Sequence, residues 1–213
     1  MKKLFLLPLL SVIISCQPSK ITGSWTARDI TPKKYEKILV LGVLTDSDFE
    51  LQSKIENHMA DDLKELGYNS VAANKIFPPG TFVKGDSARA KAAIEGKGFD
   101  GILTIVMLNK EKEQVYVPGN SIDNDYYNRF GRFDRYMTEV SDRIYLPGYY
   151  AEQTKYLWEN NFYDLGSRQL IYSARTSTFD IASKTTLAHT YGLLMVQSLI
   201  HKKIILKSDK EDE

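Results

Sequence analysis

The segment ILVLGVL, residues 38–44, decides the fold, because it is a run of seven apolar residues without a single charge. A strand that is buried on both faces of a parallel sheet has this composition, whereas a strand with one solvated face alternates apolar and polar residues. The run GILTIVML at residues 101–108 repeats the pattern with one threonine. We therefore predict that the two runs form the central strands of one sheet.

A helix is predicted directly after the first of these strands. Ser47 and Glu50 have the spacing of a capping box, and Gly67 stands where a C-terminal cap is expected. Between them, apolar residues recur at intervals of three or four: Leu51, Ile55, Met59, Leu63 and Leu66. This spacing places them on one face of an amphipathic helix.

The segment between this helix and the second apolar run contains two shorter elements. Residues 69–73 predict a short strand, and residues 87–97 predict an alanine-rich helix that ends at two glycines. The resulting order, βαβαβ, predicts right-handed crossovers and a mixed, partly parallel sheet.

The C-terminal part completes the predicted domain. Residues 155–164 and 169–178 have the pattern of an antiparallel hairpin, and residues 183–203 that of an amphipathic helix. We expect one α/β domain over residues 25–206, followed by a solvated tail at residues 207–213.

The N-terminus indicates an exported, lipid-anchored protein. Two lysines precede an apolar run at residues 4–14, which is shorter than the ~20 residues of a membrane-spanning helix. Cys16, the only cysteine, follows Ile-Ile-Ser, and this end of the run resembles the lipobox of bacterial lipoproteins, in which the cysteine is acylated. We expect residues 1–15 to be removed and Cys16 to be lipidated. An ordinary cleaved signal peptide and a buried structural thiol are the alternatives.

The mature chain that this processing leaves has a short connection to its membrane. Residues 16–24 contain Pro18 and Gly23 without periodicity and predict a linker, with an edge strand at residues 25–29. Loss of the two leader lysines leaves 26 basic against 27 acidic residues, a formal charge of −1. Such a chain has no basic excess for phosphates, so we expect no nucleic-acid partner.

Residues 118–150 differ from the rest of the chain. They hold eight aromatic and nine charged residues without a sustained period, and so long a loop is functional or disordered in most compact domains. Arginine and tyrosine are enriched at interface hot spots. The candidate partner-binding residues are Tyr126, Tyr127, Arg129, Phe130, Arg132, Phe133, Arg135 and Tyr136. The alternative is that these rings fold back over the sheet as a lid.

No cluster of residues predicts catalysis. Gly85-Asp86-Ser87 resembles the nucleophile motif of one class of lipases and esterases, but no buried strand precedes it and no aspartate lies three residues before any of the three histidines. Asp46 and Asp48 follow the first buried strand and would repel a phosphate at the next helix N-terminus. We therefore expect no catalytic residues, no cofactor and no metal.

Several segments together resemble a family of uncharacterised Gram-negative lipoproteins. They are the two buried strands, the tyrosine-rich loop after Val117-Pro118-Gly119, WENNFYD at residues 158–164 and IYSA at residues 171–174. That family is similar in fold to the curli-assembly lipoprotein and to the lipoproteins that activate penicillin-binding proteins. The resemblance covers about residues 35–203 and implies an α/β fold and an envelope location, but it supplies no catalytic residues.

These observations lead to one functional hypothesis and two alternatives. We expect a non-catalytic lipoprotein on the periplasmic face of the outer membrane, with the cell surface as the alternative location. By the lipoprotein resemblance, Gln17 is not the aspartate that retains enteric lipoproteins at the inner membrane. The protein would hold its membrane through Cys16 and bind an envelope protein or a second copy through residues 118–150. An envelope glycan-binding protein is the alternative, and an enzyme is the least expected class.

Overall fold

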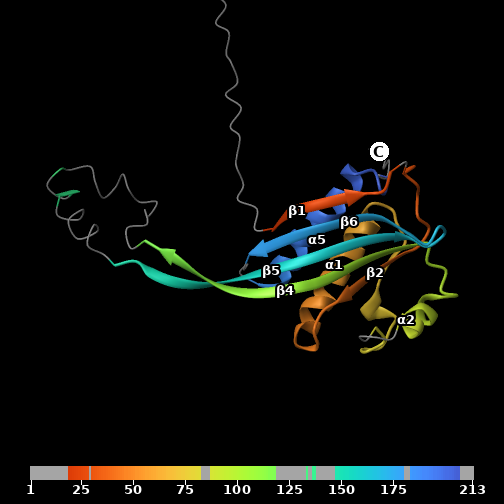
Figure 1. Ribbon diagram of the computed structural model, residues 1–213, viewed down its shortest axis with the longest axis horizontal. Coiled ribbons are helices and arrows are strands. Elements are labelled where there is room, and N and C mark those ends of the chain that lie inside the picture. Colours follow the sequence, from red (N-terminus) through yellow and green to blue (C-terminus); the bar gives the residue numbers. More distant parts are fainter. Residues whose placement is uncertain are drawn as a thin grey trace, which may run out of the picture.

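The computed structural model describes residues 19–28, 30–82, 87–118, 133, 136–137, 147–179 and 183–206. They form one six-stranded sheet in the order β1-β6-β5-β4-β2-β3 (Figure 1). β2 is parallel to β3 and β4, and every other pairing is antiparallel, which confirms the predicted mixed α/β sheet. In chain order the elements are β1 (Ser19–Thr26), β2 (Ile38–Val43), the 3-10 helix η1 (Asp46–Asp48), α1 (Phe49–Glu65), β3 (Ser70–Ala72), η2 (Ala73–Lys75), α2 (Ser87–Ile94), β4 (Gly101–Val117), β5 (Tyr149–Asp164), β6 (Gln169–Phe179) and α5 (Lys184–His201).

The two apolar runs are the central strands, as predicted. β2 and β4 pair in parallel, with Ile38 opposite Gly101 and Val40 opposite Leu103. Val40 and Ile105 have no exposed surface, since both faces of the sheet are covered here. Continuous burial explains why these strands lack the alternation of a half-solvated strand.

The helices form two layers of unequal size. α1 and α5 pack side by side on one face, and their apolar residues form the main core with Trp158, Phe162 and Tyr172 of the sheet. On the other face, α2 and the segment after η2 cover only the β2–β3–β4 side, through a smaller core that contains Leu39, Leu41 and Phe77. Among the described residues, no helix has the length and apolar character needed to span a membrane.

The two ends of α1 differ in how well they were predicted. At the C-terminal end, Gly67 has a φ of +82°, and Tyr68 N–H donates to the Leu63 carbonyl, which confirms the glycine cap. The predicted capping box is wrong. A 3-10 turn precedes the helix, so Asp48 is the N-cap, and no side chain caps the first turn. The Ser47 hydroxyl instead pairs with Thr45 Oγ1 at 2.9 Å.

The predicted linker is also wrong over part of its length. β1 starts at Ser19 and runs along β6 at the edge of the sheet, so residues 19–24 belong to the domain, and the predicted edge strand at 25–29 is displaced. The register shifts between Ile21 and Gly23, and this irregularity hides the period of two. Ser19 Oγ lies 3.0 Å from Thr178 Oγ1, an interaction that no local pattern encodes.

Several other boundaries move as well. β4 continues to Val117, nine residues past its predicted end, and β5 begins at Tyr149 rather than at residue 155. The predicted loop at 118–150 therefore ends before Tyr149. The C-terminal helix is confirmed with a shorter span, and the Ser183 side chain caps it by accepting from Thr186 N–H at 3.1 Å. The leader and the charged tail lie outside the described residues.

Candidate functional site

The β4–β5 hairpin continues far beyond the sheet (Figure 1). β4 pairs with β2 only as far as Val106, and β5 pairs with β6 only from Lys155, whereas β4 and β5 pair with each other along their whole lengths. We call residues 109–117 and 149–154 the arm. Within the part of the chain that the structure describes, neither outer edge of the arm has a strand partner.

Charged pairs occupy the arm nearest the body. Lys112 Nζ lies 3.0 Å from Glu152 Oε2 across the two strands, and Lys155 Nζ lies 3.1 Å from Glu113 Oε1. Pairs this exposed contribute little to stability. They keep the base of the arm hydrophilic on both faces, so it has no apolar face with which to pack on its own domain.

The distal part of the arm is uncharged and aromatic. Residues 114–117 and 149–151 read QVYV and YYA. Tyr116, Tyr149 and Tyr150 are 53%, 61% and 68% exposed. The rings of Tyr116 and Tyr150 meet edge to face with centroids 5.4 Å apart, which leaves much of both rings open to a partner.

The structure describes only two of the eight candidate partner-binding residues. Phe133 is 77% exposed, and Tyr136 is partly buried. The other six lie outside the described residues: Tyr126, Tyr127, Arg129, Phe130, Arg132 and Arg135. Cys16 also lies outside them. The predicted segment is thus attached to the end of the arm, between Val117 and Tyr149.

Sequence reasoning missed that the arm is a paired hairpin. The sequence pattern that could have indicated it is the run NKEKEQVYV at residues 109–117, in which lysine and glutamate alternate. Such alternation suits a strand that is solvated on both faces and forms ion pairs with the facing strand. The exposure of Tyr149 and Tyr150 also bears on the lid alternative. These two rings project from the arm and do not cover the sheet.

The strand register places the start of the domain at the base of the arm. Ser19 of β1 lies opposite Thr178, Thr178 opposite Tyr156, and Tyr156 opposite Lys110, so the four residues form one row across the sheet. β1 runs in the same direction as β5, from the arm end towards the body. The chain that leads to Cys16 therefore enters the domain at the end from which the arm projects.

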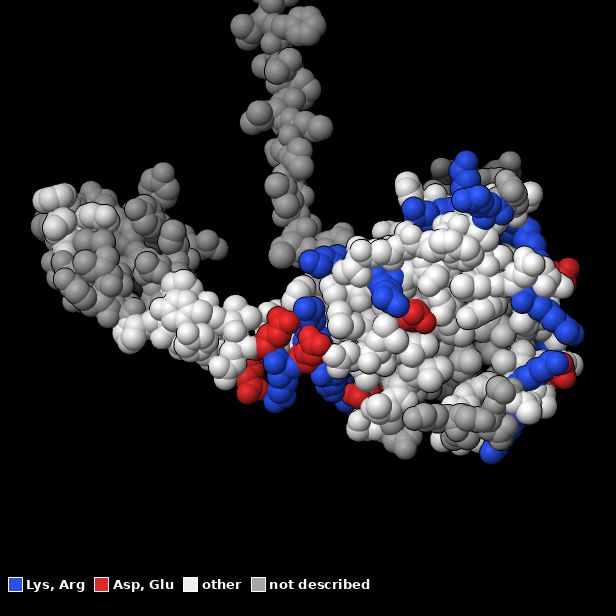
Figure 2. Space-filling view, in the orientation of Figure 1, with Lys and Arg blue, Asp and Glu red and all other residues white. Residues whose placement is uncertain are grey.

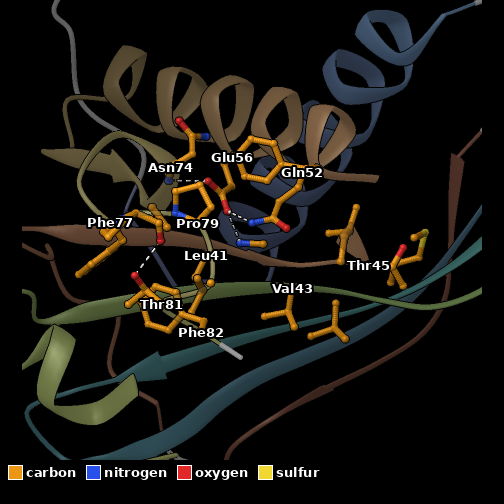
Figure 3. Close-up of a pocket in the computed structure, with 18 residues that line it drawn as sticks. Leu41, Val43, Thr45, Gln52, Glu56, Asn74, Phe77, Pro79, Thr81 and Phe82 are labelled. Carbon is orange, nitrogen blue, oxygen red and sulfur yellow. Dashed lines mark hydrogen bonds between the residues drawn. The ribbon is translucent and has the colours of Figure 1, made fainter. Parts of the chain in front are cut away.

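A pocket of about 730 Å³ opens at the carboxyl ends of the parallel strands, beside the first turns of α1 (Figure 3). Small-molecule sites occur often at this edge of α/β sheets. Phe49, Phe77 and Phe82 contribute aromatic walls, and the last two rings contact each other edge to face at 5.0 Å. The pocket is thus mainly apolar.

Glu56 lies fully buried at the floor of this pocket. Its Oε1 accepts hydrogen bonds from Gly42 N–H at 2.8 Å and from Gln52 Nε2 at 3.0 Å, and its Oε2 accepts one from Asn74 N–H at 2.8 Å (Figure 3). β3 pairs with β2 only as far as Ala72, so the carboxylate replaces the missing strand neighbour of Gly42. Burial raises the pKa of Glu56, although the three hydrogen bonds favour its ionised form. Glu56 therefore joins β2 to η2 through hydrogen bonds of its carboxylate, and we call this contact the Glu56 brace.

A second cluster of titratable groups lies between the two large helices. His58 of α1 and His189 of α5 lie with ring centroids 5.6 Å apart, although they are far apart in the sequence. Burial raises the pKa of the nearby Asp62 carboxyl, whereas the two histidines lower it. Within the described ranges, no three histidine, cysteine or acidic side chains are grouped so as to hold a metal ion.

Comparison with known proteins finds similarity only at the level of structure. No protein-family model and no curated protein matches the chain. The PelC dodecamer from Paraburkholderia phytofirmans is 10% identical, covers 88% of this chain and 99% of its own, and has a TM-score of 0.43. Lipoprotein GNA1162 from Neisseria meningitidis is 14% identical, with coverages of 78% and 99% and a TM-score of 0.42. A PDZ domain protein from Parabacteroides distasonis is 11% identical, with coverages of 85% and 35% and a TM-score of 0.40. Such distant likeness carries no functional argument.

Proposed function

We propose that this chain is a non-catalytic envelope lipoprotein whose arm and the attached segment 118–148 bind another protein. The observation that carries the proposal is the hairpin that leaves the sheet, with neither of its outer edges paired to another described strand. Tyr116 and Tyr150, each more than half exposed, lie at its distal end. The leader and Cys16 supply the envelope address and the lipid anchor.

The energetics of the arm favour a role in binding. An isolated two-stranded hairpin is marginal in water, and open strand edges expose the protein to aggregation. In the described part of the chain, the base of the arm carries charged pairs on both faces, so it offers no apolar face that could offset these costs by packing on the body. A partner strand on either edge, or a pocket that receives the tyrosines, would stabilise it.

Site-specific photo-crosslinking in cells tests the proposal. A benzophenone amino acid at Tyr150 should yield one discrete adduct with an envelope protein, while the same group at Lys91, a similarly exposed residue of α2, should yield none. If these arginines bind the partner, a triple Arg129→Ala, Arg132→Ala, Arg135→Ala variant should lose the adduct. Its melting temperature should then stay within about 3 °C of wild type, because substitutions away from a core usually change stability little.

The possible outcomes separate the alternatives. An adduct at twice the monomer mass would make the partner a second copy of this chain. Equal adducts from Tyr150 and Lys91, or none from either, would contradict a binding role for the arm. A large loss of stability in the arginine variant with capture intact would favour the lid instead.

A further inference from the structure

Among the described residues, no helix packs on one side of the sheet over four strands. α1 and α5 cover the opposite side, and the smaller core under α2 reaches only as far as β4. We call the bare side of β1, β6, β5 and the adjoining part of β4 the open face. Figure 1 looks onto this face, with α1 and α5 behind the strands.

A single row of side chains crosses the open face. Trp25 lies opposite Ser173, Ser173 opposite Asn161, and Asn161 opposite Thr104. Paired residues of neighbouring strands project to the same side, so one exposed indole, two hydroxyls and one amide form a line. At a strand spacing of about 4.8 Å, this line is roughly 14 Å long. Trp25 is 52% exposed, which is unusual for a large ring on a sheet.

The adjacent row carries one charge of each sign at the centre of the face. Arg175 lies opposite Glu159, with Nε 3.8 Å from Oε2. The other carboxylate oxygen of Glu159 accepts a hydrogen bond from Asn161 Nδ2 at 3.1 Å, which fixes the amide of the first row. Figure 2 shows the open face as a broad uncharged area that encloses a few charged groups, with the other charges at its margins and along the arm.

We propose that the open face binds a neutral polysaccharide chain, which lies along the row from Trp25 to Thr104. A sugar ring presents an apolar C–H face that can stack on the indole, and its hydroxyls both donate and accept. They can therefore satisfy the hydroxyl of Ser173, the amide of Asn161 and the Arg175–Glu159 pair together. This proposal does not depend on the role of the arm.

The composition of the face argues against other occupants. A second sheet or a helix would need interdigitating apolar side chains, and it would bury the hydroxyl, the amide and the ion pair at a cost. A polyanion would meet the Glu159 carboxylate beside the central arginine, and this repulsion would oppose the attraction of Arg175. A lipid surface would likewise have to desolvate this polar row.

The two tryptophans of the chain give a direct test. Trp25 is exposed, whereas Trp158 is completely buried, so a ligand on the open face should change the fluorescence of Trp25 alone. The full-length mature lipoprotein would be kept in a detergent without a sugar headgroup. It would be titrated with chitotetraose, cellotetraose and maltotetraose, and with polygalacturonate as an acidic glycan. Saturable binding of at least one neutral tetrasaccharide is expected.

Variants locate the site. Trp25→Ala should weaken binding by about tenfold or more, measured by calorimetry because the fluorescent reporter is lost. Asn161→Ala should weaken it as well. Tyr116→Ala, which removes an equally exposed ring from the arm, should leave the affinity unchanged. Should Trp25→Ala lower the melting temperature, Trp25→Phe retains a ring at the edge strand and should bind between wild type and alanine.

Three outcomes would overturn the proposal. They are the absence of binding by any neutral glycan, binding of polygalacturonate alone, and neutral-glycan binding that Trp25→Ala and Asn161→Ala leave intact. Failure of the arm to crosslink a protein would have no bearing on these measurements.

Discussion

The backbone N–H of Gly42 donates a 2.8 Å hydrogen bond to Oε1 of Glu56, which joins the end of β2 to the middle of α1. The contact is so close that only glycine fits. A Cβ atom at position 42 would lie 2.6 Å from Gln52 Cγ and 2.9 Å from Glu56 Oε1.

Gly42→Ala should therefore destabilise the domain by about 1–3 kcal/mol, because the added methyl overpacks a site whose side chains are held by hydrogen bonds. Urea unfolding followed by circular dichroism measures the change. Gly23→Ala is the matched control, since a Cβ there would meet nothing within 4 Å, and its midpoint should match wild type. Equal urea midpoints for wild type, Gly42→Ala and Gly23→Ala would contradict the stabilising role of the Gly42–Glu56 contact.

Glu56 should make stability depend on pH. Its pKa is raised in the folded protein by burial, so the folded state holds the proton more tightly than the unfolded state does. The free energy of unfolding is then highest below the ordinary glutamate pKa of about 4.3, and it falls as the pH rises from that value to the raised one.

Glu56→Gln should flatten this dependence and lower stability by about 1–3 kcal/mol, because an amide has one acceptor oxygen for two backbone N–H groups. Urea unfolding at several pH values from 4 to 7 compares the two slopes. A variant that kept the slope of wild type would show that another group titrates.

The buried strands give a third prediction. Val40→Asp or Ile105→Asp would place an unpaired carboxylate where no surface is exposed, and should cost at least about 3 kcal/mol. Val43→Asp, on the same strand as Val40 but 39% exposed, should cost far less. The melting temperatures of the purified variants measure these costs. A Val40→Asp protein with the melting temperature of wild type would contradict the burial of β2.

Lipidation of Cys16 remains a prediction from the leader. Cells fed an alkyne-tagged fatty acid should label the wild-type chain, while Cys16→Ala should remain unlabelled, because the chain has no other cysteine. Label of equal strength on both proteins would refute acylation at this position.

Buried elements could be predicted because burial leaves a period in the sequence. The run at 38–44 and the spacing from Leu51 to Leu63 both record contacts with a core, and Gly67 records a local backbone conformation. The two errors at the termini of elements have local causes as well. A 3-10 turn shifted the start of α1, and a register shift hid β1.

The functional surfaces could not be predicted in the same way. The arm is solvated on both faces, so its strands show no apolar alternation, and their alternating charges become informative only once the β4–β5 pairing is known. In the sequence, Glu56 is one of several acidic residues of a helix. Its hydrogen bonds with Gly42 and Asn74 are formed only in the folded structure. Trp25 becomes part of a row only through the register of three other strands.

The row that joins Ser19 to Lys110 fixes how an anchored molecule would be oriented. Three steps along the chain lead from Cys16 to Ser19, a span of at most about 10 Å, whereas the seven steps from Lys110 to Val117 extend about 24 Å. Both leave from the same end of the sheet. With lipid on Cys16, Ser19 would lie within about 10 Å of the anchor, and Lys110, three strand spacings further on, within about 25 Å of it. The base of the arm would therefore stay near the bilayer, and a partner of its tyrosines would have to lie within the reach of one short hairpin from the membrane.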